Sequence, residues 1–315
     1  MLWQAEQVKA HIPPLDFHDI QRPMAKEVVL YNQHYGLDFE NRYPGLQHQV
    51  GMFSAAGFNI VAHVYQFTQA KGTVYLHHGY YDHAGIYGNI IEHCLRQGFN
   101  VFIYDLPGHG LSSGERAAID SFAQYDEVFS KGLSLIQQHL PQPLALMGQS
   151  TGGAVIINYL LSRGISRDTS PFKKIVLMAP LVRPLKWGRG QLFYYLVRPF
   201  TQRVKRVFSV NSGCEKFVNF IRESDPLQPL FLRTNWVGAL RKWIKTIEAC
   251  APVDLDVQVI QGTDDGTVDY QYNLQVLKQK FVGLRVQYVV QGQHQLVNED
   301  AEKLQQVLKV ITPII

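Results

Sequence analysis

One serine of the chain lies between glycines in the pattern G-x-S-x-G. The segment Gly148-Gln-Ser-Thr-Gly-Gly153 directly follows an apolar run that we expect to be a strand, and directly precedes a helical run. So sharp a turn leaves no room for side chains at Gly148 and Gly152 and puts Ser150 at its apex. The start of the helix would favour developing negative charge. The pattern predicts that Ser150 is a nucleophile, and the alternative is a serine that only caps a helix.

A serine nucleophile needs a base, and the base needs an orienting acid. His294 is the only histidine after Ser150, and it follows the last predicted strand. We therefore expect His294 to be the base, so that activity rises with pH with a midpoint near ~6 to 7. The turn after the preceding strand contains Asp264, Asp265 and Asp269. We favour Asp265 as the acid, and the other two remain alternatives because such turn residues also serve as helix caps.

A histidine-glycine loop follows an earlier predicted strand. In sites of this kind the oxyanion accepts hydrogen bonds from the backbone N–H after the nucleophile and from an N–H of such a loop. These donors should be Thr151 and Tyr80, with Gly79 letting the backbone approach the substrate. We interpret the histidines of this loop as scaffolding, because no carboxylate pattern supports a metal site. Neither a metal nor an organic cofactor is expected.

Strands alternate with helices along most of the chain, which positions these residues. Apolar runs and alternating patterns predict strands at residues 60–67, 73–76, 101–104, 144–147, 175–178, 257–260 and 286–290. Helical patterns lie between and after them, at residues 87–97, 122–139, 154–162, 273–281 and 301–311. This order predicts right-handed crossovers and a mostly parallel sheet flanked by helices. The candidate residues would then gather at the carboxyl ends of the strands.

Residues 181–249 break this rhythm. They are aromatic, interrupted by prolines, and expected to form a helical cap inserted between two parts of one core, residues 1–180 and 250–315. Residues 181–245 contain 13 Lys or Arg and 3 Asp or Glu, whereas the rest of the chain has 17 and 23. Aromatic residues such as Trp187 and Tyr194 could line a substrate pocket. The basic residues predict peripheral contact with an anionic membrane, and the alternative is an ordinary solvated face.

Several segments resemble the monoacylglycerol lipase and lysophospholipase group of α/β hydrolases, often placed with serine aminopeptidase-like hydrolases. His78-Gly-Tyr-Tyr-Asp-His83 resembles the HGxxxH loop of the group, and Asp105-Leu-Pro-Gly-His-Gly-Leu-Ser112 resembles its DxxGHGxS loop. The turn from Gly148 to Gly153, which we call the elbow, is similar to the GHSMGG motif of the group, with Gln149 in place of the common histidine. Gln295 replaces the glutamate that often follows the catalytic histidine. The resemblance implies an α/β-hydrolase fold and an esterase acting on monoacylglycerols or lysophospholipids.

Composition narrows the function classes. With 46% apolar and 18% charged residues, the chain is globular, and a net charge of +4 does not indicate nucleic acid binding. Three cysteines without close spacing suit a reducing compartment, and no signal peptide is evident, so a cytoplasmic location is expected. The leading hypothesis is a serine hydrolase of small or lipid-like esters. General carboxylesterase or amide hydrolase activity, and a degenerate hydrolase fold used as a binding module, are the alternatives.

Overall fold

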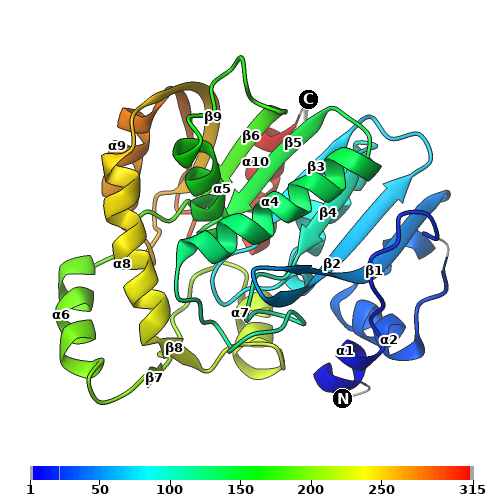
Figure 1. Cartoon of the computed structure of the whole chain (residues 1–315), viewed down its shortest axis with the longest axis horizontal. Coiled ribbons are helices and arrows are strands. Elements are labelled where there is room, and N and C mark those ends of the chain that lie inside the picture. Colours follow the sequence, from blue (N-terminus) through cyan, green and yellow to red (C-terminus); the bar gives the residue numbers. More distant parts are fainter. Residues whose placement is uncertain (1–2, 21, 313–315) are drawn as a thin grey trace.

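An eight-stranded sheet forms the centre of the computed structural model, which describes residues 3–20 and 22–312 (Figure 1). Its strands lie in the order β1-β2-β4-β3-β5-β6-β9-β10. β1 and β4 each pair antiparallel with β2, and all the other pairs are parallel, as the alternation of strands and helices predicts. The strands are β1 (Leu46–Ala55), β2 (Phe58–Phe67), β3 (Thr73–His77), β4 (Asn100–Tyr104), β5 (Leu144–Gln149), β6 (Phe172–Met178), β9 (Val253–Gly262) and β10 (Phe281–Val289).

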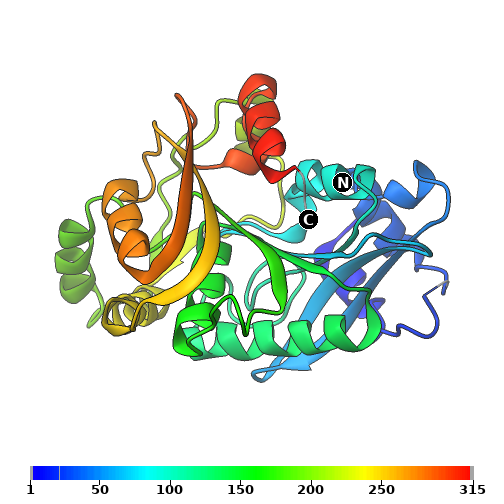
Figure 2. The ribbon, with the colours of Figure 1, turned by 90° about the horizontal axis from the view of Figure 1, so that it is seen from above.

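Successive side chains of the central strands enter two separate cores, because a strand points its residues alternately to opposite faces. In β3, Tyr75 belongs to one buried cluster, while Val74 and Leu76 belong to the other. α4, α5, α8 and α9 supply the first cluster, and α1, α2, α3 and α10 supply the second. Figure 2 shows α3 and α10 on one side of the sheet and α4 and α5 on the other. Burial on both faces explains why these strands are short apolar runs.

The helices that flank the sheet mostly follow the predicted positions. They are α1 (Ala5–Ala10), α2 (Lys26–Tyr35), α3 (Gly88–Arg96), α4 (Phe122–His139), α5 (Thr151–Ser162), α8 (Thr234–Ala249), α9 (Tyr270–Lys280) and α10 (Ala301–Ile311). Short 3-10 turns occur at η1 (Phe39–Asn41), η2 (Ala84–Ile86) and η3 (Leu296–Asn298). Ser121 begins α4 with a capping box. Its hydroxyl accepts from Ala123 N–H, and the Gln124 side-chain oxygen accepts from Ser121 N–H.

Three of the last elements begin earlier than predicted, since β9 begins at Val253, α9 at Tyr270 and β10 at Phe281. The helix expected at residues 273–281 begins three residues earlier, because the Asp269 carboxylate accepts from Tyr272 N–H and caps it. Phe281 begins β10 and is buried in the first cluster, so its assignment to the helix was wrong. The sequence patterns also gave no prediction for α1, α2 or β1. In β1 the buried polar side chains of His48 and Gln49 obscure the alternation of apolar residues.

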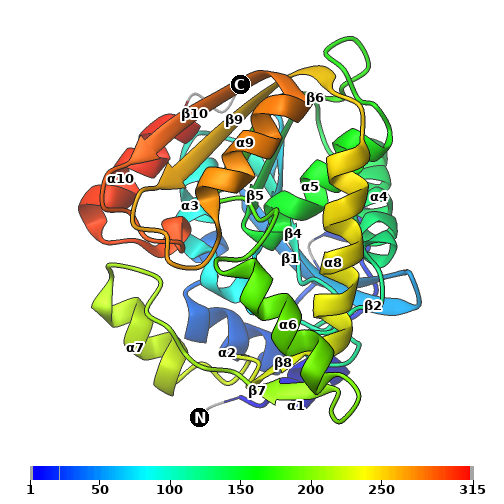
Figure 3. The ribbon, with the colours of Figure 1, turned by 90° about the vertical axis from the view of Figure 1, so that its left-hand side faces the viewer.

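The segment between β6 and β9 supplies three helices and a small ribbon. α6 (Trp187–Val197), α7 (Glu215–Glu223) and the antiparallel pair β7 (Arg203–Lys205) and β8 (Phe231–Arg233) lie together at one end of the sheet (Figure 3). α8 instead packs on α4 and α5, with Trp236, Leu240 and Trp243 buried in the first cluster. The predicted cap of residues 181–249 therefore includes one helix that packs with the core layer. Within residues 3–20 and 22–312, no helix combines the length and apolar character required to span a membrane.

Candidate active site

Ser150 lies in a sharp turn between β5 and α5. Its backbone has φ 51° and ψ −113°, a conformation that non-glycine residues rarely adopt. A Cβ on Gly148 would lie 2.7 Å from the carbonyl carbon of Gly152, and one on Gly152 would overlap the carbonyl oxygen of His77. The turn is held because Ser150 N–H donates to the Met178 carbonyl at 2.9 Å. Both glycines are thus required by close backbone contacts, as the sequence pattern predicts.

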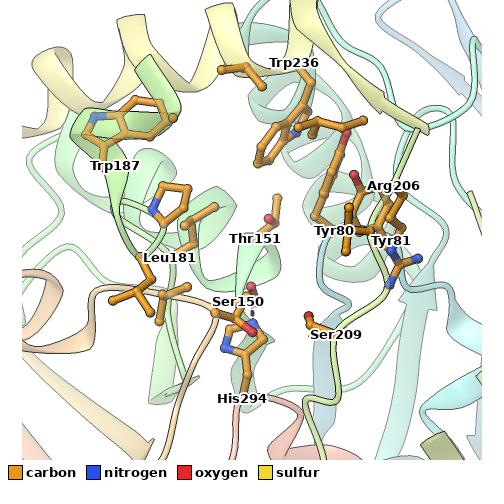
Figure 4. A pocket seen from close by; sticks show the side chains of 18 of the residues that line it. Tyr80, Tyr81, Ser150, Thr151, Leu181, Trp187, Arg206, Ser209, Trp236 and His294 are labelled. Atoms are coloured by element: carbon orange, nitrogen blue, oxygen red, sulfur yellow. Dashed lines mark hydrogen bonds between the residues drawn. The ribbon is translucent and has the colours of Figure 1, made fainter. Parts of the chain in front are cut away.

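Three predicted residues from separate parts of the chain meet at this turn. The Nε2 atom of His294 lies 2.9 Å from the Oγ of Ser150, and the Nδ1 atom of the same ring lies 2.8 Å from Oδ2 of Asp265. All three residues are buried, with exposed fractions of 5 to 8%. Figure 4 shows His294 directly beneath Ser150, with the connecting hydrogen bond. This arrangement can move a proton from the serine hydroxyl to an imidazole that a carboxylate orients.

Of the three candidate acids, only Asp265 contacts the imidazole. Its other oxygen accepts from the N–H groups of Thr267 at 2.9 Å and Val268 at 3.0 Å, which fixes the carboxylate. Asp264 is exposed, and Asp269 binds Arg183 through two guanidinium hydrogen bonds of 3.0 and 2.7 Å besides capping α9. The choice of Asp265 among the three therefore agrees with the geometry.

The buried pair of Asp265 and His294 is electrostatically coupled. Burial alone would raise the pKa of Asp265, but the facing His294 and the hydrogen bonds from Val268 and Thr267 lower it below its usual value. Burial alone would lower the pKa of His294, yet Asp265, with a smaller contribution from Asp82, raises it above 6.5. The carboxylate is thus kept charged, and the imidazolium that would form during proton transfer is stabilised.

The predicted oxyanion donors, Tyr80 and Thr151, line the same cavity as Ser150 (Figure 4). The neighbouring N–H of Gly79 donates to the Tyr87 hydroxyl at 2.9 Å. By contrast, the backbone N–H groups of Tyr80 and Thr151 donate to no group within the described residues. Stacking of the Tyr80 ring on Trp236, with centroids 3.8 Å apart, holds the loop in place. Two free N–H groups near a serine that could act as a nucleophile suit a developing oxyanion.

The loop histidines take structural positions. His77 is buried, which lowers its pKa to about 3, and it stacks on Phe129. His78 accepts from Leu106 N–H at 2.8 Å, and His83 lies 2.9 Å from the Asp225 carboxylate. Within the described part of the chain, no group of three or more His, Cys, Asp or Glu side chains could hold a metal ion.

A cavity of about 340 Å³ opens above Ser150 and His294. Its lining is mostly apolar and includes Leu181, Pro184, Trp187, Tyr194, Leu232 and Trp236. The predicted substrate contacts Trp187 and Tyr194 therefore face this cavity. Gly79 does not line it, because it lies behind Ser150, where an added Cβ would be 3.3 Å from the serine Cβ. A contact between Gly79 and a substrate stays a prediction.

Two glutamines that the sequence analysis assigned no role connect the loops of the site. Gln149 Nε2 donates to the carbonyl of His294 at 2.7 Å, and Gln295 Nε2 donates to both carboxylate oxygens of Asp82 at 3.0 Å. The Tyr87 hydroxyl also donates to Asp82 at 2.8 Å. The glutamines thereby tie the histidine loop to the elbow and to the Tyr80 loop. Their positions next to Ser150 and His294 were the available signal in the sequence.

Comparison with solved structures identifies the class. The fold matches that of a soluble variant of monoglyceride lipase from Saccharomyces cerevisiae, with a TM-score of 0.71 over 86% of this chain and 94% of that chain, at 16% identity. The chain therefore has the α/β-hydrolase fold, and that prediction is confirmed. The sequence profile described as serine aminopeptidase, S33, matches residues 68–301. The protein belongs to this family of hydrolases, as its motifs predict.

Curated relatives share shorter segments. A monoglyceride lipase of Rattus norvegicus is 29% identical over 113 residues, which span 36% of this chain and 36% of that protein. A phospholipase of Bacillus subtilis is 27% identical over 202 residues, which span 61% of this chain and 75% of that protein. The match to the lipase thus covers little more than a third of its length.

Replacing Asp265 by Asn should lower kcat by about 10⁴ while the protein stays folded, because the amide would hold His294 in the wrong tautomer. Asp264→Asn is the matched control: the same chemical change one residue earlier, on an exposed side chain, should alter kcat less than a few-fold. Ester hydrolysis of both variants, with circular dichroism as a check of folding, tests the assignment. A larger loss in Asp264→Asn than in Asp265→Asn would refute it.

Activity should rise with pH, with a midpoint above 6.5. The base must be neutral, and because the pKa of His294 is raised in the folded protein, it stays protonated to a higher pH than a free histidine. Activity is therefore lost as the pH falls through this raised pKa. The dependence of kcat/KM on pH with an uncharged ester checks this expectation. A midpoint below 6.5 would show that burial outweighs the effect of Asp265.

Proposed function

We propose that this protein hydrolyses carboxylic esters of lipid-like substrates through an acyl-enzyme formed on Ser150. The observation that carries the proposal is the buried chain of hydrogen bonds from Ser150 through His294 to Asp265 at the floor of an apolar cavity. Family membership and the names of the lipase and phospholipase relatives support the same reaction class.

In the proposed reaction, the Oγ of Ser150 attacks the ester carbonyl while Nε2 of His294 takes the hydroxyl proton. The oxyanion would accept from the N–H groups of Tyr80 and Thr151. Collapse of the tetrahedral intermediate breaks the bond to the alcohol, which leaves with the proton from His294. Water, deprotonated by His294, then attacks the acyl-enzyme, and the carboxylic acid leaves as Ser150 regains its proton.

The wall of the cavity supports an acyl substrate. On α6, Trp187, Gly190, Tyr194 and Val197 face the cavity at the spacing of one helical face. The cavity lies within the usual range of about 300–1,000 Å³ for small-ligand pockets. An aliphatic chain in contact with these side chains would be removed from water, which is favourable by about 0.8 kcal/mol per buried CH₂ group.

Amide hydrolysis is the closest alternative, because the family description names an aminopeptidase and the same acyl-enzyme chemistry cleaves amides. A panel of glyceryl, lysophospholipid and nitrophenyl esters, with the corresponding anilides, separates the two reactions. A binding module without catalysis is disfavoured by the intact hydrogen-bond chain.

Ser150→Ala should abolish labelling by a fluorophosphonate probe and lower kcat for the preferred ester by on the order of 10⁴ or more. Ser162→Ala, at an exposed position on the same helix α5, should keep both. Near-normal ester hydrolysis by Ser150→Ala would end the proposal. Labelling and turnover of the wild-type protein give the reference.

We also propose that α6 contacts anionic membranes. Its outer face exposes Leu192, Tyr195 and Leu196 by 52 to 63%, next to Phe200 at 89%. Exposed basic residues such as Arg189 and Arg198 flank this apolar surface. The opposite face of α6 lines the cavity, so one helix could both shape the pocket and rest in the lipid interface. We likewise propose the cytoplasmic location that the sequence predicts.

The protein should co-sediment with anionic vesicles at low salt, not with neutral ones, and raised salt should release it, because each basic residue contributes only about 1 kcal/mol that salt screens. Leu196→Ser should weaken this binding, whereas Val290→Ser should not, because Val290 is similarly exposed (69% against 62%) but lies outside α6. No binding to anionic vesicles at low ionic strength would contradict the proposal.

A further inference from the structure

The cavity has unlike ends. Figure 4 shows Leu181 and Trp187 on one side of Ser150, and Arg206 and Ser209 on the other. Both sets of residues line the same cavity. An ester bound with its carbonyl at Ser150 would therefore extend its two halves toward different surroundings. The acyl chain fits the apolar side, which leaves the alcohol portion on the side of Arg206.

Arg206 is held in place without a carboxylate partner. Its Nη1 donates to Gln228 Oε1 at 2.9 Å, and its guanidinium carbon lies 4.0 Å from the centroid of the Tyr81 ring. Within the described residues, the guanidinium has no carboxylate oxygen within 4.0 Å, and its Nε and Nη2 form no hydrogen bond. The side chain is only part-exposed. A cation so placed is desolvated, which lowers its pKa, without a neutralising contact.

The nearest carboxylates are engaged elsewhere. Asp82 accepts from Gln295 and Tyr87, and burial raises its pKa. Asp225 accepts from Tyr35 at 2.7 Å and lies 2.9 Å from His83. Both act on Arg206 only from a distance. The free N–H groups of Arg206 are therefore available to a ligand in the cavity.

We infer that Arg206 binds an anionic group, a phosphate or a carboxylate, carried by the alcohol portion of the ester substrate. The inference rests on the proposed ester hydrolysis, whose substrate class it narrows. The free Nε–H and Nη2–H groups form one edge of the guanidinium, and this edge matches the paired oxygens of either anion. Contact with Tyr81 and Gln228 fixes the plane of the group beforehand, which reduces the entropy lost on binding.

Binding of non-hydrolysable ethers tests this inference apart from catalysis. Calorimetry would compare the decyl ethers of glycerol, glycerol 3-phosphate and glyceric acid below their micellar concentrations; these share one tail and differ in the terminal hydroxyl, phosphate or carboxylate group. The wild-type protein should bind at least one anionic ether more tightly than the neutral ether, and the comparison of phosphate with carboxylate identifies the anion. Arg206→Gln should weaken anionic binding about 10- to 100-fold more than neutral binding. Arg206→Lys should retain part of the preference.

Arg222→Gln is the matched control. Arg222 belongs to the same inserted segment and contacts Phe208 as Arg206 does, at 5.9 and 5.8 Å, but it is exposed and outside the cavity. It should leave the ratio of anionic to neutral affinity unchanged. An unchanged ratio in Arg206→Gln, or no anionic preference in the wild-type protein, overturns the inference. Hydrolysis of the matching decanoyl esters is measured separately, so a failure of the proposed reaction is distinguishable from a failure of the Arg206 assignment.

Discussion

The turn at Ser150 is the constraint on which the site depends. Its positive φ is tolerated because β5 is paired on both sides and α5 starts at once, while Gly148 and Gly152 permit contacts that no side chain would allow. Strain of this kind persists only where the surrounding structure over-determines it. The same turn places Ser150 at the cavity and leaves the Thr151 N–H free, so one backbone conformation positions both the proposed nucleophile and a proposed oxyanion donor.

Polar contacts between loops extend this constraint outward. Gln149 donates to the His294 carbonyl. Asp82, in the loop that contains Tyr80, accepts hydrogen bonds from Gln295 and from the Tyr87 hydroxyl. The bond from Gln149 is buried and those to Asp82 are part-buried, so removing the Gln149 side chain would leave a buried carbonyl unsatisfied at a cost of about 1–3 kcal/mol. The site is therefore rigid because its three loops share partners. Gln149 and Gln295 depart from the family motif, but both still form hydrogen bonds that connect the loops of the site.

The inserted segment supplies much of the lining of the cavity. One face of α6 closes the apolar side of the cavity, and the strand-linked Arg206 borders the other side. The basic residues of this segment differ in their exposure to solvent. Arg189 and Arg198 are exposed, whereas Arg206 is only partly exposed. Screening by salt weakens the first kind of charge much more than the second.

The sequence by itself determined the parallel sheet and the turn at Ser150, because strand periodicity and glycine spacing are properties of neighbouring residues. It also indicated His294 as the base, because no other histidine follows Ser150. The choice of Asp265 was an inference from the turn, whereas its contact with His294 is visible only when residues 29 apart are brought together. The antiparallel β1 escaped detection because the buried polar residues His48 and Gln49 interrupt its apolar alternation. The contacts of Gln149, Gln295 and Arg206 were decided by tertiary structure alone, since each side chain bonds to a group that the fold brings to it from elsewhere in the chain.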